Sequence, residues 1–233
     1  MTTYLNRILF LVIVLGLIIS LAGCGSDGGS STKARFEVTL TNLTANQPMA
    51  PMAAILHNQN FTAWQLSAVA SDGLEQLAEG GDPTAFLTEA ADNTDVRDNL
   101  AGGGITPPGG SDRVTLSGTL NGTRLSVASM LVNSNDAFTG ISGHSLDSLQ
   151  VGQSIVIDVN SYDAGTEDNS ETASGIPGPA GGGEGFNAVR DDRDFIAVHP
   201  GVVSADDGLA TSVLDESHRI QNPVARLKVT RTD

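Results

Sequence analysis

The chain has 233 residues, with 27 acidic residues against 12 basic ones and a net charge of −15. A surface this acidic repels nucleic acid and attracts cations, so we expect no nucleic-acid partner and regard a divalent metal ion as a natural one. The roughly 200 residues that follow the N-terminal segment are enough to bury the core of one domain.

The first 24 residues have the pattern of a lipoprotein export signal. Arg7 precedes an apolar run at 8–21, which is short for a membrane-spanning helix. The run closes on Leu-Ala-Gly-Cys at 21–24, and Cys24 is the only cysteine in the sequence. This pattern resembles the bacterial lipobox, so we expect a signal peptide over 1–23 and lipidation of Cys24. An uncleaved N-terminal membrane anchor is the alternative interpretation.

The residues after Cys24 favour a place in the cell envelope. Gly25, rather than Asp, follows Cys24, which resembles the pattern sorted to the outer membrane in Gram-negative bacteria. We therefore expect an envelope protein that is held in the membrane by its N-terminal lipid. Residues 24–34 are rich in Gly and Ser, which predicts a flexible tether before a single domain at 35–233. That domain contains no cysteine and therefore cannot form a disulfide.

Alternating polar and apolar residues predict short, half-buried β-strands in several parts of the chain. Turn residues separate them, and no βαβ pattern is present, so the fold class that we expect is all-β, an antiparallel β-sandwich. The predicted strands lie at 35–41, 114–116, 125–132, 155–159 and 225–229.

Two short helices are predicted between the first two of these strands. Asp72 and Glu75 have the spacing of a capping box, and the helix that they begin should end at the glycines of 80–81. Asp82 then offers an acceptor at a second N-cap, with Pro83 in the first helical position. We expect these helices to cover one end or edge of the sheets.

Acidic side chains gather in a long loop that follows the strand at 155–159. The loop runs from 160 to 192, far longer than the usual connection of about 4–6 residues. Four carboxylates lie within 163–171, and Asp136 follows another predicted strand. Hard cations such as Ca²⁺ take six to eight oxygen ligands, many of them from such loops. A solvated acidic loop is the alternative, which composition alone favours.

Other residue patterns carry no catalytic signature. The sequence lacks the common motifs for a serine nucleophile, a zinc protease or a phosphate-binding loop. Trp64 and Phe61 could offer an aromatic contact to a ligand, but we expect them in the core, because aromatic residues are scarce here. We expect structural or surface roles for the four scattered histidines: His57, His144, His199 and His218.

Several segments, taken together and in order, resemble the spondin domain in its bacterial form. Two blocks carry most of the likeness: Asp-Ala-Gly-Thr at 163–166 and Asp-x-x-x-Gly at 136–140. The resemblance spans about 35–231, nearly the whole chain after the expected signal. The segments that carry it lie at 36–44, 70–82, 134–140, 162–167 and 222–226.

The resemblance implies a sandwich related to calcium-dependent membrane-targeting sandwiches. It also implies one Ca²⁺ ion, held by residues that correspond here to Asp136, Asp163 and Glu167. Glu167 departs from the animal pattern, where Asp is usual, and Asp168 is a potential substitute. The other domains of the animal proteins are absent from this sequence, so their matrix and receptor partners cannot be carried over.

The interpretation that we favour is a lipid-anchored, non-enzymatic, calcium-binding envelope protein of the spondin-domain type. Its expected role is adhesion, through binding to a surface protein or a glycan. One alternative is a hydrolase of envelope polymers, with Asp163 and Glu79 as acid and base, which would require carboxyls about 5–9.5 Å apart across a cleft. A purely structural lipoprotein is the other alternative.

Overall fold

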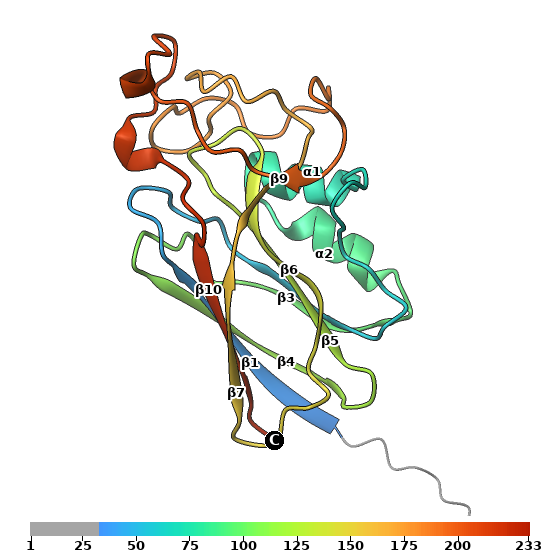
Figure 1. Ribbon diagram of the computed structural model, residues 1–233. Helices are drawn as coiled ribbons and strands as arrows, with labels where there is room; N and C mark the ends of the chain where they lie inside the picture. Colours follow the sequence, from blue (N-terminus) through green and yellow to red (C-terminus); the bar gives the residue numbers. More distant parts are fainter. Residues whose placement is uncertain (1–32) are drawn as a thin grey trace, which may run out of the picture. The chain divides into compact units, whose positions relative to one another are not determined.

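A computed structural model describes residues 33–233. They form two antiparallel β-sheets packed face to face, with two α-helices beside them (Figure 1). The expected signal peptide at 1–23 and the lipidation site at Cys24 lie outside the described residues. The first strand begins at Lys33, so the expected tether at 24–34 overlaps this strand by two residues.

The smaller sheet has the strand order β4-β1-β10-β7, and the larger one β3-β2-β5-β6-β8-β9. All strand pairs are antiparallel, which confirms the expected all-β sandwich. The strands are β1 (Lys33–Asn42), β2 (Ala53–His57), β3 (Val96–Ala101), β4 (Ser111–Thr119), β5 (Arg124–Met130), β6 (Ala137–Ser145), β7 (Ser154–Val159), β8 (Ser161–Asp163), β9 (Ala197–Val198) and β10 (Ala225–Arg231). The helices are α1 (Asp72–Gly80), α2 (Thr84–Ala91) and two 3-10 turns, η1 (Ala205–Asp207) and η2 (Glu216–His218).

Alternation along β1 builds one wall of the core between the sheets. Phe36, Val38 and Leu40 are fully buried, whereas the intervening side chains point outward. Val38 pairs with Val229 of β10 on one side and with Val114 of β4 on the other, so apolar side chains meet across three strands. Each buried side chain of this size stabilises the fold by about 1.5–3 kcal/mol relative to exposure.

The sequence pattern did not predict β2, and burial explains why. All five of its residues are buried, because both faces of the larger sheet are covered. Ala54 and Leu56 lie in the core between the sheets, whereas Ala53 and Ile55 pack in the cluster beneath the helices. A strand with two buried faces has no polar alternation to detect.

The helices cover the outer face of the larger sheet, which corrects the expectation that they would cover an end or edge. Helix α1 packs on β5 and β6, and α2 packs on β2 and β3. Their apolar side chains share a cluster with Trp64, which is 8% exposed and lies 4.7 Å from Tyr162 between ring centroids. The expected core position of Trp64 is therefore confirmed.

The cap predictions were each displaced by one residue. Ser71, not Asp72, is the N-cap of α1, and its hydroxyl accepts a hydrogen bond from the Leu74 amide at 3.2 Å. Pro83 is the N-cap of α2, while the Asp82 carboxylate still accepts from a backbone amide of the first turn at 2.9 Å.

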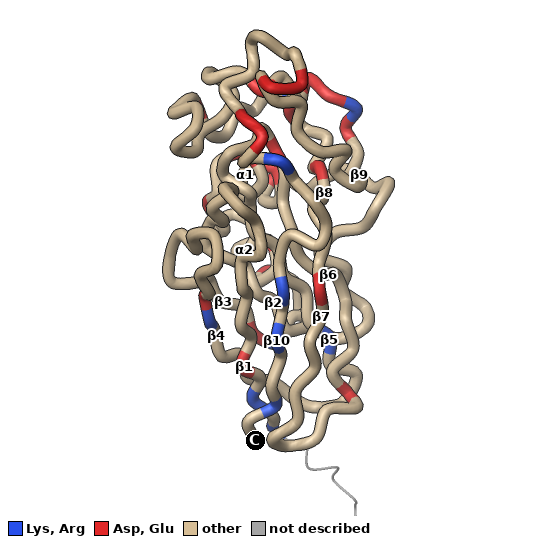
Figure 2. The backbone as a smooth tube through the Cα atoms, turned by 60° about the vertical axis from the view of Figure 1, so that its left-hand side comes forward, with Lys and Arg blue, Asp and Glu red and all other residues tan. Residues whose placement is uncertain are grey.

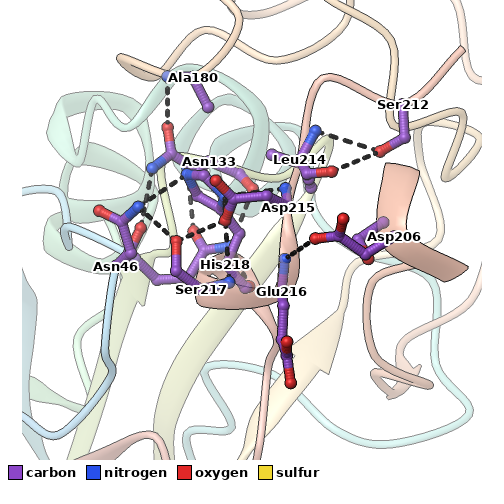
Figure 3. A network of polar contacts seen from close by, with 12 residues as sticks. Asn46, Asn133, Ala180, Asp206, Ser212, Leu214, Asp215, Glu216, Ser217 and His218 are labelled. Atoms are coloured by element: carbon purple, nitrogen blue, oxygen red, sulfur yellow. Dashed lines mark hydrogen bonds and ion pairs between the residues drawn. The ribbon is translucent and has the colours of Figure 1, made fainter.

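Long loops crowd one end of the sandwich and are held together by side-chain to backbone hydrogen bonds (Figure 3). Asn133 is central to them: its amide oxygen accepts from the Ala180 amide, and its amide nitrogen donates to the Asn46 carbonyl, both at 3.0 Å. The buried Gln47 side chain donates to the carbonyls of Asn133 and His218, both at 2.9 Å. Segments from four parts of the chain, at 46–47, 133, 180 and 218, therefore share one polar network.

None of the helices within residues 33–233 is long and apolar enough to cross a membrane.

Gly140 gives a direct test of how closely β5 and β6 approach. Its φ is +154°, and a Cβ there would overlap the carbonyl oxygen of Val127 on the neighbouring strand. Gly140→Ala should therefore lower the free energy of unfolding by about 2–4 kcal/mol, measured by chemical denaturation. The control is Gly122→Ala, also at positive φ but in open space, which should cost about 1 kcal/mol. Equal losses in the two variants would contradict the close approach.

Candidate metal centre

Two predicted ligands are brought together by one strand pair. Asp136 directly precedes β6, and Asp163 is the last residue of β8. The strands pair with Ala137 opposite Asp163, so the two carboxylates are neighbours at the loop end of the larger sheet. The loops that carry them follow the predicted strands at 125–132 and 155–159. They meet because the chain crosses from the smaller sheet to the larger one between β7 and β8.

Asp136 is fully buried, and only one of its two carboxylate oxygens has hydrogen-bond partners. Its Oδ2 atom accepts from the backbone amides of Thr166 at 2.8 Å and Glu167 at 3.3 Å. Its Oδ1 atom is buried and has no hydrogen-bond partner. Burial, followed by the nearby charge of Asp163, raises the pKa of Asp136 to about 7. A free carboxylate oxygen in this position is costly unless something binds to it.

Asp163 is also fully buried, but both its oxygens have partners. Oδ1 accepts from the Gly165 amide at 2.9 Å, and Oδ2 accepts from the Asn169 side chain at 2.7 Å. Oδ2 also forms an ion pair with Arg193 at 3.2 Å. Gly165 has φ +74°, and a Cβ there would overlap the backbone of Phe195, so the turn after β8 requires glycine.

Glu167 lies in the turn that follows β8, but its carboxylate forms a hydrogen bond with a side chain outside that turn. Its Oε1 atom accepts from the Asn135 side chain at 3.0 Å, and burial raises its pKa to about 7. Asp168, the potential substitute for Glu167, is exposed. Within residues 33–233, no three acidic, histidine or cysteine side chains are grouped so as to hold one metal ion. The structure therefore brings Asp136 and Asp163 together without closing a three-carboxylate site, and metal binding stays a prediction.

Two residues beside this pair were not expected from the sequence. His199 is 4% exposed; its Nδ1 atom accepts from the Gly201 amide at 3.0 Å, and its Nε2 atom has no partner. Burial lowers its pKa to about 4, although the charge of Asp163 opposes this shift. Arg193 also pairs with Asp192, at 2.8 Å. No spacing signal could reveal either contact, because both residues lie at least 30 positions beyond Asp163.

Glu79 of α1 is a third buried acid at this end. It is 1% exposed, its Oε2 atom accepts from the Asn187 amide at 2.9 Å, and its Oε1 atom has no partner. Burial raises the pKa of Glu79, and the charge of Glu79 in turn contributes to the raised pKa values of Asp136 and Glu167. Glu79 and Asp163 are both shielded from solvent, which is unsuited to an acid and base acting across an open cleft.

Residues 42–176 match the family model Spondin_N. This matched region is more than half of the chain and includes all three predicted ligands. The chain belongs to the spondin N-terminal domain family. This confirms the resemblance read from the sequence, and it supports a spondin-type extracellular or surface protein. The family is not a known enzyme family. A search of curated proteins found no match. The matched region of the spondin domain excludes Arg193 and His199.

A pH-dependent test concerns Glu171, an acid of the same loop that is 2% exposed. Its Oε1 atom accepts from the Val203 amide at 3.2 Å, and burial raises its pKa to about 7 from an ordinary value of 4.5. The neutral carboxyl is favoured in the fold, so ionisation destabilises the protein as pH rises from about 4.5 to 7. Glu171→Gln should therefore have little effect near pH 4.5 and stabilise the protein by about 1–3 kcal/mol at pH 8.

Denaturant unfolding at both pH values measures this difference. Glu216→Gln, at an exposed position, removes the same charge and should change stability by less than about 0.5 kcal/mol at either pH. If Glu171→Gln has the same effect at pH 4.5 and pH 8, the buried carboxyl does not control the pH dependence.

Proposed function

We propose that this spondin domain is a non-enzymatic, calcium-binding domain, held at the bacterial cell envelope by a lipid on Cys24. One observation carries the calcium proposal: the buried Oδ1 atom of Asp136 has no partner and lies beside a second buried carboxylate, Asp163. Adhesion, through a surface protein or a glycan, is the role that we propose for the domain.

The balance of charge around the pair supports a cation. Arg193 forms an ion pair with Asp163 but none with Asp136, whose partners are backbone amides. Leaving one of two adjacent buried carboxylates without a counter-charge is costly. Calcium takes carboxylate and carbonyl oxygens from flexible loops. A bound ion would supply the missing positive charge and a partner for Oδ1, with Asp136 and Asp163 as its protein ligands and Glu167 within the same turn.

The position of the pair connects a cation to a binding surface. Acidic residues collect at the loop end of the sandwich and beside α1, whereas most basic residues lie toward the opposite end (Figure 2). The loop at 164–196 has no regular secondary structure. A cation at its base would hold the loop in one conformation, and an ordered loop end is a surface on which a protein or glycan can bind.

Calcium should raise the melting temperature of the full-length protein, solubilised in detergent and measured at fixed ionic strength. Asp136→Asn should remove most of this rise, because it replaces a charged ligand with a neutral amide. Asp163→Asn should do the same, and Glu167→Gln should reduce the rise by a smaller amount, since its carboxylate bonds to Asn135.

The control is Asp92→Asn, an exposed acid at the C-cap of α2, which removes the same charge far from the pair. It should keep the wild-type response, because general screening of an acidic protein is shared by all its carboxylates. If calcium raises the melting temperature of wild type and of Asp136→Asn equally, the acidic loop contains no metal site. That result would favour the alternative of a purely structural lipoprotein.

The proposed anchoring rests on the sequence pattern that ends at Cys24. Cys24→Ser removes the thiol that carries the lipid, so the variant should lose the lipid and retain its signal peptide. Membrane fractionation and mass spectrometry of the purified protein measure the two effects. A wild-type protein that carries no lipid and keeps residues 1–23 would instead indicate an uncleaved membrane anchor.

A further inference from the structure

The two sheets are closed against each other along one side of the sandwich. β3 is an edge strand of the larger sheet, and β4 is an edge strand of the smaller one. Asp98 of β3 accepts a hydrogen bond from the Ser117 amide of β4 at 2.7 Å, and Arg97 donates to the carbonyls of Thr119 and Asn121. Side chains therefore occupy backbone groups at this pair of edges, which protects them from pairing with another strand.

The opposite side of the sandwich is open, because the chain crosses there from β7 in the smaller sheet to β8 in the larger one (Figure 1). β8 pairs with β6 only at 137–139. The rest of β6, at 141–145, has no strand partner other than β5 in the described part of the chain. Ile141, Ile155 and Ile157 pack against the core along this side and are only partly buried. A free strand edge therefore lies beside apolar side chains that the sandwich does not fully cover.

A hollow of about 670 Å³ follows this free edge, with a lining from the segment 62–66, from 141–145 and from Tyr162. Side chains from both faces of β6 take part in it. Ile141 faces the core, whereas the Ser142 hydroxyl donates to the Trp64 carbonyl on the outer face at 2.6 Å. The hollow thus surrounds the strand edge, and its volume lies within the usual range of about 300–1,000 Å³ for ligand sites.

The chemistry of the hollow favours an uncharged peptide. Among the described residues that line it, none is Asp or Glu, although the chain has 27 acidic residues. Partial burial and the charge of Arg124 lower the pKa of His144, so its side chain is neutral at pH 7. Trp64 is buried against Phe138 and Tyr162, which leaves little ring surface on which a sugar could stack. An extended peptide, in contrast, can pair its own backbone with the strand edge.

The free edge also has a fixed shape. Ser142 and Gly143 form a bulge opposite Ser126 of β5. The Gly143 amide donates to the Ser126 hydroxyl at 2.9 Å, and the Gly143 carbonyl accepts from Arg124 at 2.7 Å. An edge that is already held in one conformation loses little conformational entropy when a strand binds to it.

We propose that the edge of β6 at 141–145 is a docking site for an extended, uncharged segment of another protein, which adds to the larger sheet as a further strand. The added backbone would continue the line of β8 beside β6. Its inward side chains would cover the partly buried isoleucines at the open side of the sandwich. The site lies along the side of the domain and needs no metal ion, so it does not depend on the proposed calcium binding.

The test begins with a phage-displayed library of short linear peptides, selected on the full-length protein in detergent. Fluorescence polarisation then measures the affinity of the selected peptides for wild type and two variants. Leu66→Asp places a charge in the lining of the hollow and should weaken binding at least about tenfold. Val69→Asp is the matched control, because it adds the same charge at an exposed apolar residue outside the lining; affinity should stay within about twofold of wild type. Both variants should melt as wild type does, since both side chains are exposed.

A second measurement separates backbone pairing from side-chain contact. Methylation of alternate amide nitrogens in a selected peptide removes the hydrogen-bond donors along one of its edges and leaves its side chains unchanged. The methylation pattern that faces β6 should abolish binding, whereas the pattern that faces away should retain it. Hydrogen exchange of the protein amides at 141–145 should slow when the unmethylated peptide is bound.

Four outcomes would overturn the inference. If no library peptide binds wild type more tightly than Leu66→Asp, the hollow is not a peptide site. If both methylated peptides bind as the parent does, or both aspartate variants weaken binding equally, no strand is added at this edge. If neutral oligosaccharides on a glycan array bind wild type but not Leu66→Asp, the hollow takes a sugar. If wild type is a dimer by light scattering and Leu66→Asp is a monomer, the occupant is a second copy of the chain. Each of these results leaves the proposed calcium binding untouched, since that proposal is tested at Asp136.

Discussion

The pairing of β6 with β8 is the contact on which the loop end depends. β8 has only three residues, yet it carries the chain from the smaller sheet to the larger one and sets Asp163 opposite Ala137. This register places Asp136 beside Asp163, and the glycine turn at 165 then directs two backbone amides at Asp136. A shift of β8 by one residue would turn Asp163 to the other face of the sheet and separate it from Asp136.

The second constraint is that both faces of the larger sheet are covered. One face packs against the smaller sheet, and the other lies under α1 and α2. The helix layer brings Glu75 and Glu79 within reach of loops more than 80 residues further along the chain. Arg190 contacts the backbone of Ala70 as well as Glu75, so the loop is attached to the helix and to the segment before it. The acidic end is therefore built jointly by sheet, helix and loop.

Several buried carboxylates at one end of a domain have a net energetic cost. Burial raises the pKa values of Asp136, Glu167 and Glu171 to about 7, which means that each resists ionisation in its place in the fold. Residues with such perturbed values cluster at functional sites more often than elsewhere, because selection for stability alone would remove them. The cation binding proposed above would offset this cost.

The sequence alone determined the features that depend on local patterns. Alternation located β1, β4, β7 and β10, each of which has one face in the core and a more exposed opposite face. It also located β5, although both faces of that strand are buried. It missed β2, whose two buried faces remove the alternation, and also β3 and β6. The short β8 and β9, whose positions depend on pairing partners, were missed as well. The family resemblance supplied Asp136, Asp163 and Glu167. The tertiary structure decided that Glu167 bonds to Asn135, that Arg193 pairs with Asp163, and that Glu79 accepts a hydrogen bond from the Asn187 amide. Those contacts join segments far apart in the chain, and no local spacing encodes which of them will meet.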